Sequence, residues 1–213
     1  MYNGYLAFFL GLYWYFATND RTCSKKIDTI ELIMLASTAA HFTWDLIYMK
    51  YHGILEMGNL IHHMMGISSY YMTFYQQMNA NLLVLNLFPA EFTNFNMHFR
   101  EVLKRIGWRY TWTYYVNEYL YSYLYIICRV FWIPAIYYWM ITCDTTNPAV
   151  NIIYPLHSIM GWYYVSMLPK MIRVRTREIK QIKEHKFELK WFDPINVEKM
   201  KELKIGLFEP YSN

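Results

Sequence analysis

Charged residues are scarce in this sequence: Asp, Glu, Lys and Arg together make up 17% of its 213 residues. Ordinary soluble domains carry about 25%, so the scarcity argues against such a domain. Cysteine is also rare, and the three residues form no CxxC motif and no paired spacing. We therefore expect neither a disulfide framework nor a zinc site. The sequence has no nucleotide-binding glycine loop, and its apolar start lacks the basic segment of a signal peptide, so we expect none.

Apolar and aromatic residues are abundant, at 55% and 20% of the chain. The mean hydropathy of +0.04 understates this, because 22 Tyr and 8 Trp count as polar although both suit a membrane interface. Since a spanning helix needs about 20 apolar residues, the sequence predicts an all-α, polytopic membrane helix bundle with about six transmembrane helices over residues 1–169. Pro134 is expected to kink the fifth helix. The expected spans are about 2–18, 29–48, 54–75, 82–98, 113–142 and 149–168.

The basic residues indicate an orientation. With six spans, the basic connector 99–109 and the basic tail 170–213 lie on the same side of the membrane. The loops of the opposite side hold only Arg21, Lys25 and Lys26. Because basic loops stay on the inner side, both termini are expected on the cytoplasmic or the matrix side. The expected membranes are the endoplasmic reticulum or another endomembrane, or the mitochondrial inner membrane.

The tail, residues 170–213, differs from the rest because it mixes basic and apolar residues. Ile172, Ile179 and Ile182 stand among Lys and Arg, a pattern typical of a basic amphipathic helix near anionic lipid headgroups. A solvated helix that simply continues the last span is the alternative. A short second helix is expected after Asp193, with Gly206 at its end.

Polar residues form one stripe on each of five expected spans, since residues three or four apart share a helix face. Ionisable groups inside a bilayer are costly, so they pair with each other or line a functional cavity. Both interpretations stay open for His41 with Asp45 and for His157. Glu118 and Arg129, three turns apart, each need a partner elsewhere, and structural pairing is favoured for them. The stripes are His41, Asp45 and Tyr48; Glu56, Asn59, His63, Gly66 and Tyr70; Glu91, Asn94 and His98; Glu118, Ser122, Tyr125 and Arg129; and Asn151, Tyr154, His157 and Ser158.

The adjacent histidines His62 and His63 are the most distinctive feature, and they point about 100° apart on a helix. A di-iron desaturase would need several HxxHH boxes, whereas the chain has 7 His and one adjacent pair. Haem ligation is disfavoured by the acids that accompany the histidines. We therefore predict no metal and no cofactor. The basic tail suits lipid headgroups better than nucleic acid, and we expect no nucleic-acid partner.

At these residues the chain resembles the TLC-domain family, the membrane domain shared by ceramide synthases, translocon-associated membrane proteins and several small lipid-homeostasis proteins. The resemblance covers about residues 29–173. It departs from the family at Asn94, where the family has Pro, and before Trp162, where the family has an amide. The matching residues are His41, Asp45, Asn59, His62, His63, Glu91, Thr93, Phe95 and Arg100.

The resemblance implies about six helices around a cavity that opens to lipid. In ceramide synthases the paired histidines serve acyl transfer from acyl-CoA to a sphingoid amine. Carried over, His62 or His63 would be the base or nucleophile, and Asp45 or Glu91 would orient it. The ceramide synthases have a His-Asp pair and further acids after their histidines, but this chain has no acid between His63 and Glu91. It is more similar to the small TLC-only members, for which lipid binding is implied.

The expected function is therefore lipid binding or membrane-lipid homeostasis without catalysis, with a phospholipid or acyl chain as ligand. One alternative is an accessory subunit of a large complex, for example in the mitochondrial inner membrane, where the aromatic-rich helices and the tail would contact other subunits. The other alternative is an acyl-CoA-dependent acyltransferase that uses His62, His63 and Asp45. The residues expected to line the cavity are His41, Asn59, Glu91, Asn94, His98 and Arg129.

Overall fold

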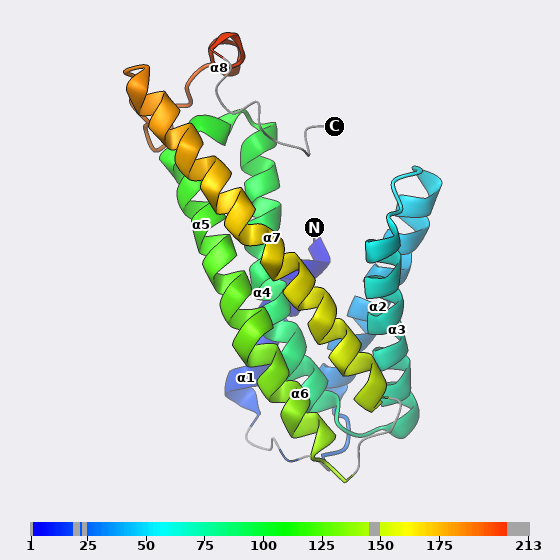
Figure 1. The fold of residues 1–213 in the computed structure, drawn as a ribbon. Coiled ribbons are helices and arrows are strands. Elements are labelled where there is room, and N and C mark those ends of the chain that lie inside the picture. The colour runs from blue at the N-terminus through cyan, green and yellow to red at the C-terminus, as the bar shows by residue number, and fades with distance from the viewer. Residues whose placement is uncertain (1, 19–21, 23–24, 145–149, 204–213) are drawn as a thin grey trace. The chain divides into compact units, whose positions relative to one another are not determined.

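The computed structural model describes residues 2–18, 22, 25–144 and 150–203. The described residues form helices and an isolated antiparallel bridge between Lys26 and Met78, and they contain no β-strand (Figure 1). The prediction of an all-α chain is confirmed. The elements are α1 (Tyr2–Ala17), α2 (Thr29–Tyr51), α3 (Met57–Gln76), α4 (Ala80–Arg105), the 3-10 helix η1 (Trp108–Tyr110), α5 (Trp112–Ile126), the π-helix η2 (Ile127–Trp132), α6 (Ile133–Ile141), α7 (Val150–Glu184) and α8 (Val197–Glu202).

Two described helical stretches are long and apolar enough to cross a membrane, Thr29–Tyr51 and Trp112–Ile141. They correspond to the second and fifth expected spans. The second stretch joins α5, η2 and α6, so a π-helical segment stands just before Pro134, where we expected a kink.

Two helices, α4 and α7, extend well beyond the expected ends of their spans. Helix α4 continues to Arg105, so the first part of the basic connector is helical. Helix α7 continues to Glu184, and the expected boundary at residue 169 therefore falls inside a helix. Pro169 does not end α7, because the residues after it are good helix formers and their apolar face is buried, as described below.

The chain divides into two compact units. The first unit comprises Met1–Phe92 and Ile127–Trp162, and the second comprises Thr93–Ile126 and Tyr163–Asn213. Helices α4 and α7 contribute residues to both units. In the first unit, α2 and α3 lie side by side (Figure 1). Its buried core includes Trp14, Met34, Leu35, Leu82, Val84, Ile133, Tyr137 and Tyr154.

An ion-pair cluster holds the start of α2 in the first unit. Asp28 caps the helix, and its carboxylate and that of Glu31 form a reciprocal capping box with the backbone. The Lys25 ammonium lies 2.7 Å from Asp28 and 2.6 Å from the fully buried Glu31, which also accepts a hydrogen bond from the Trp14 indole. Burial lowers the pKa of Lys25, but hydrogen bonds and the charges of both carboxylates outweigh it and raise the pKa above its usual value. This lysine is therefore charged and neutralised within the chain.

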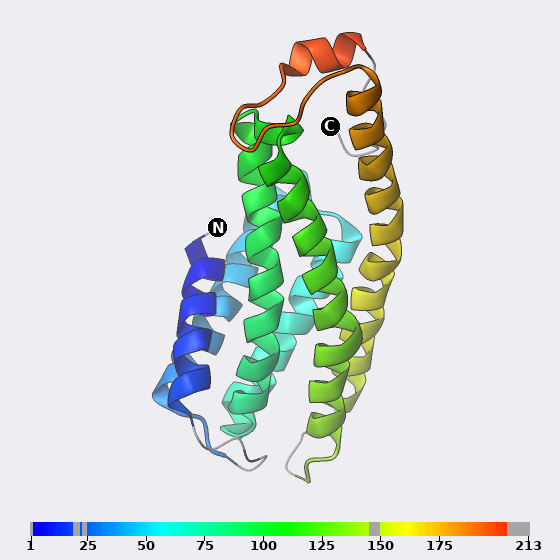
Figure 2. The ribbon, with the colours of Figure 1, turned by 90° about the vertical axis from the view of Figure 1, so that its left-hand side faces the viewer.

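The second unit has a separate core, to which the tail contributes. Ile182 and Leu189 are buried in it together with Leu103, Tyr114 and Tyr115. The segment after α7 crosses the ends of α4 and α5 (Figure 2). The backbone N–H of Trp112 donates a 2.9 Å hydrogen bond to the Lys190 carbonyl. The apolar face that suggested a helix lying on lipid is thus covered by the chain itself. The expected short second helix is α8, and its expected end at Gly206 lies outside the described residues.

The cysteines differ from expectation. Cys143, just after α6, is disulfide-bonded, whereas Cys128 in η2 is a buried free thiol. Cys23 lies outside the described residues. The prediction of no disulfide was wrong for Cys143, because it rested on spacing along the chain, and a disulfide depends on Cα atoms that approach to about 6 Å in the folded structure.

Candidate functional site

The histidine pair lies on α3 and is held against α2. His63 Nδ1 lies 3.3 Å from the carbonyl oxygen of Phe42, so Nδ1 carries the proton and donates. The Phe42 ring lies 4.7 Å from the His63 ring and 5.9 Å from the His62 ring, centre to centre. A Cβ on Gly66 would stand 2.5 Å from the Phe42 ring. A side chain at position 66 would therefore force the Phe42 ring to shift.

A chain of polar and aromatic side chains continues from His62 across three further helices. The His62 and His157 rings meet edge to face at 4.9 Å. His157 lies 6.4 Å from Tyr137, which stacks on Tyr154 at 4.5 Å with the ring planes 6° apart. The Asn86 amide nitrogen lies 3.3 Å from the Tyr137 hydroxyl. We call His62, Asn86, Tyr137, Tyr154 and His157 the interior polar cluster.

Three polar atoms of this cluster are buried and, within the described part of the chain, have no hydrogen-bond partner. They are Asn86 Oδ1, Tyr154 Oη and His157 Nε2. An unmatched buried polar atom costs about 1–3 kcal/mol, and native proteins leave few of them without a partner from the protein, water or a ligand. Three on neighbouring side chains therefore indicate a place for a polar partner that is not part of these residues.

Two ionisable residues are buried in the same unit. Glu91 on α4 and Arg129 in η2 are only 5% and 7% exposed, and both act electrostatically on Tyr70 of α3. Both take part in further interactions within the chain. Charged groups at such depth are stable only when they are compensated. Glu91 and Arg129 are therefore part of the polar interior of this unit.

One of the two carboxylates predicted to orient the histidines, Asp45, pairs elsewhere. Asp45 Oδ2 lies 3.3 Å from Nε2 of His41, one turn away on α2, and both side chains are partly exposed. His63 is oriented instead by a backbone carbonyl. The described residues contain no group of three or more His, Cys, Asp or Glu that could hold a metal ion.

A tryptophan side chain of this unit supplies a hydrogen bond that a proline removes from the backbone of α4. Pro89 has no N–H, so the carbonyl of Leu85, four residues earlier in α4, loses its helical partner. The Trp132 indole N–H donates to that carbonyl at 3.2 Å. Within a bilayer such a carbonyl has no water to bind. Trp132 therefore replaces the hydrogen bond that Pro89 removes.

The same arrangement recurs at Pro134. In π-helical geometry the donor lies five residues after the acceptor, and Pro134, five residues after Arg129, has no N–H to donate to the Arg129 carbonyl. The Trp162 indole N–H of α7 donates to this carbonyl at 3.1 Å. Gly161 allows the approach, since a Cβ there would stand 3.3 Å from Arg129 Cδ. Sequence reasoning saw Trp162 only as an aromatic match, although Pro89 and Pro134 were visible signals of missing donors.

The remaining expected cavity residues are divided between the units. The first unit contains His41, Asn59, Glu91 and Arg129 together with the histidine pair. Asn59 is half-buried on α3. Asn94 and His98, half-buried on α4, belong to the second unit. The i, i+3, i+7 stripe of α4 was recognised from the sequence, but the boundary between the units after Phe92 was not.

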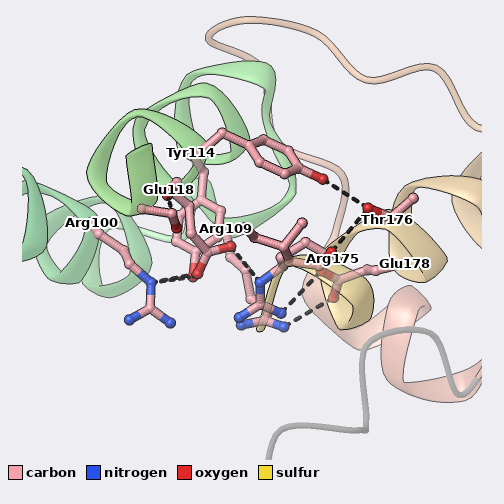
Figure 3. Close-up of polar contacts among 10 residues, drawn as sticks. Arg100, Arg109, Tyr114, Glu118, Arg175, Thr176 and Glu178 are labelled. Atoms are coloured by element: carbon pink, nitrogen blue, oxygen red, sulfur yellow. Dashed lines mark hydrogen bonds and ion pairs between the residues drawn. The ribbon is translucent and has the colours of Figure 1, made fainter. Parts of the chain in front are cut away.

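The second unit holds a buried ionic network that the sequence did not reveal (Figure 3). Glu118 on α5 accepts from Arg100 Nε at 2.7 Å and from Arg175 Nε. Glu178 accepts from Arg109 at 2.9 Å and from Arg175 at 3.1 Å. Both glutamates and Arg175 are at least 97% buried. This network ties α4, α5 and the tail portion of α7 together.

Charge compensation in this network is strong. Burial lowers the pKa of Arg175, but the nearby charges of Glu118 and Glu178 outweigh it and raise the pKa above its usual value. The guanidinium carbons of Arg100 and Arg175 also lie 6.0 and 5.9 Å from the Tyr114 ring centre. The one sequence signal was Arg175 and Glu178, an i, i+3 ion pair inside a segment with an apolar face.

The helical fold and the two long apolar stretches are compatible with a helical membrane protein. Its half-buried histidines and its buried carboxylate and arginine lie among apolar helices, as expected of polar sites within membranes. The TLC-domain family model matches residues 1–173, so the chain belongs to the TLC-domain family, a family of membrane proteins related to lipids. The predicted resemblance is confirmed. No curated protein and no solved structure matches the chain.

Proposed function

We propose that this chain is a multi-pass membrane protein that holds a lipid in its first unit and does not catalyse a reaction. The observation that carries the proposal is the set of three buried polar atoms without partners, on Asn86, Tyr154 and His157. Inside a bilayer the available partners are lipids and trapped water. Membership of a lipid-related membrane family supports the lipid.

The chemistry of the interior polar cluster defines what such a ligand would present. Tyr154 offers a hydroxyl donor, Asn86 offers an amide acceptor, and His157 Nε2 can act as either. None of the three carries a fixed charge. They therefore suit a neutral part of a lipid that combines an ester or amide carbonyl with a hydroxyl, while apolar neighbours accept the acyl chain.

A six-span topology with both termini on the cytoplasmic or matrix side is part of the proposal. Helix α3 has 20 residues and α4 has 26, which suffices to cross about 30 Å of hydrocarbon. Lys25 is neutralised by Asp28 and Glu31, so the loop before α2 carries less positive charge than its sequence suggests. This supports placing that loop on the outer side.

The disulfide of Cys143 supports the same orientation. In six-span topology the turn after α6 lies on the outer side, opposite the termini. Disulfides persist in oxidising compartments such as the lumen of the endoplasmic reticulum. A disulfide at this turn therefore fits an endomembrane, and it equally fits the outer face of the mitochondrial inner membrane.

Acyl transfer is the second candidate, and one observation favours it. Because His63 Nδ1 donates to the Phe42 carbonyl, Nε2 of the neutral imidazole is the nitrogen that can accept a proton, as a general base requires. Against this, Asp45 pairs with His41. The assay is acyl transfer from an acyl-CoA to a sphingoid amine by the purified chain. We expect none, and turnover that His63→Ala abolishes would establish the enzyme.

The lipid-binding proposal is tested by native mass spectrometry of the chain extracted in mild detergent. We expect one class of copurifying lipid, retained less well by Tyr154→Phe and His157→Phe. Tyr138→Phe, an exposed tyrosine on α6, is the matched control and should retain the lipid. Recovery without lipid, together with a Tyr154→Phe variant more stable than wild type, would refute the proposal. A native gel of the same extract shows whether the chain instead migrates within a large complex.

A further inference from the structure

A cleft of about 330 Å³ lies in the second unit, outside the polar sites described above. It is formed where α7 ends and the following segment turns back toward the start of α5. Phe187 and Leu189 supply apolar surface, and Leu189 is buried in the core. The other lining residues are Trp112, Lys183, Lys186 and Glu188.

Two lysines and one carboxylate, that of Glu188, line the cleft, so its net charge is positive. Among the described residues, neither Lys183 nor Lys186 has an ion-pair partner, and Lys199 lies 4.9 Å above the Phe187 ring. Other lysines of the tail are paired within the described segment. These pairs are Lys180 with Glu184, Lys190 with Asp193 and Lys201 with Glu198. The two cleft lysines are therefore available to an external anion.

The backbone at Lys186 is held in a conformation that favours glycine. Its φ is 60°, in the left-handed region that side chains other than Gly, Asn and Asp rarely adopt. Lys186 stands just after α7 in a Schellman motif, in which the Phe187 N–H bonds to the Ile182 carbonyl and the Lys186 N–H to the Lys183 carbonyl. Glycine is the usual residue there. Strain of this kind concentrates at functional positions.

The position of the cleft along the chain indicates its surroundings. Trp112 is the first residue of the apolar stretch Trp112–Ile141 and also lines the cleft. Tryptophan is enriched where a spanning helix leaves the hydrocarbon. The cleft therefore lies at the depth of the lipid headgroups. Positive charge at this depth attracts anionic lipids.

We propose that this cleft binds the phosphate of an anionic phospholipid headgroup. Lys183 and Lys186 bind the phosphate, and Phe187, Leu189 and Trp112 contact the glycerol and the upper acyl chain. The proposal rests on the membrane placement of Trp112–Ile141 and not on a lipid in the first unit, so either proposal can fail alone.

The test titrates the full chain in a nonionic detergent with dihexanoyl phosphatidylglycerol, dihexanoyl phosphatidylcholine and inorganic phosphate, by isothermal calorimetry. We expect saturable binding of the phosphatidylglycerol. Loss of charge in Lys183→Gln or Lys186→Gly should weaken it about fivefold each. Lys180→Gln, which removes a paired lysine from the same helix, should bind as wild type.

The Lys186→Gly variant separates a binding role from a merely structural one. Because glycine relieves the strain, we expect its Tm to rise by about 2–4 °C while phosphatidylglycerol binding weakens. A higher Tm with unchanged binding would overturn the proposal. Binding of inorganic phosphate, or of phosphatidylcholine, as tight as that of phosphatidylglycerol would overturn it as well.

Discussion

Removing the Trp162 indole N–H should destabilise the first unit only as long as Pro134 is present. In the wild type this N–H is 3.1 Å from the Arg129 carbonyl, to which Pro134, five residues later, has no N–H to donate. Trp162→Phe keeps an aromatic ring but removes this hydrogen bond to the Arg129 carbonyl. An unmatched buried group costs about 1–3 kcal/mol, and hydrogen bonds between membrane helices average about 0.6 kcal/mol. We expect a loss near 1 kcal/mol.

Pro134→Ala restores an N–H to the same turn. In that background, Trp162→Phe should cost only the difference in packing between the two rings. The coupling in this double-mutant cycle should therefore be close to 1 kcal/mol. For a chain of 213 residues this corresponds to about 2–4 °C in Tm. The measurement is thermal unfolding of the four purified proteins in one detergent.

Two further cycles test the reasoning. Trp132→Phe with Pro89→Ala should show the same coupling, since Trp132 donates to the Leu85 carbonyl at 3.2 Å. The crossed pair, Trp162→Phe with Pro89→Ala, should be additive because these residues serve different carbonyls. If Trp162→Phe costs the same with Pro or Ala at position 134, the indole does not replace the missing donor and the reasoning is refuted.

Three further changes test other parts of the structure. Glu118→Gln should destabilise the second unit by about 3–5 kcal/mol, because it leaves buried guanidinium groups uncompensated. The control is Glu101→Gln, which removes an exposed ion pair, and equal Tm values for the two variants would contradict the role of the network. Gly66→Ala should cost about 1–3 kcal/mol, because the new Cβ would stand 2.5 Å from the Phe42 ring. A wild-type Tm would show that the Phe42 ring moves aside without cost. In denaturant, Cys143 should resist alkylation until a reductant is added, whereas Cys128 should be alkylated without one. Mass spectrometry of the peptides shows which cysteine is alkylated under each condition.

The predictions that the sequence allowed rest on patterns within single segments of the chain. The apolar runs over 29–48 and 113–142 gave two stretches that are long and apolar enough to span a membrane, because length and composition are properties of a single segment. Membership of the TLC-domain family followed from an ordered set of motifs. The polar stripes followed from helical spacing. The short helix after Asp193 was also visible as a local signal.

The sequence by itself thus sufficed to predict that the chain is a helical membrane protein, to which family it belongs, and which face of each helix carries polar groups. Only the tertiary structure decided which faces meet. Glu118 pairs with Arg175, 57 residues away, and Trp162 binds the carbonyl of Arg129, 33 residues away. Asn94 and His98 fall in a different unit from the histidine pair. The physical reason is that helical periodicity orients a side chain around its own axis and carries no information about the neighbouring helix.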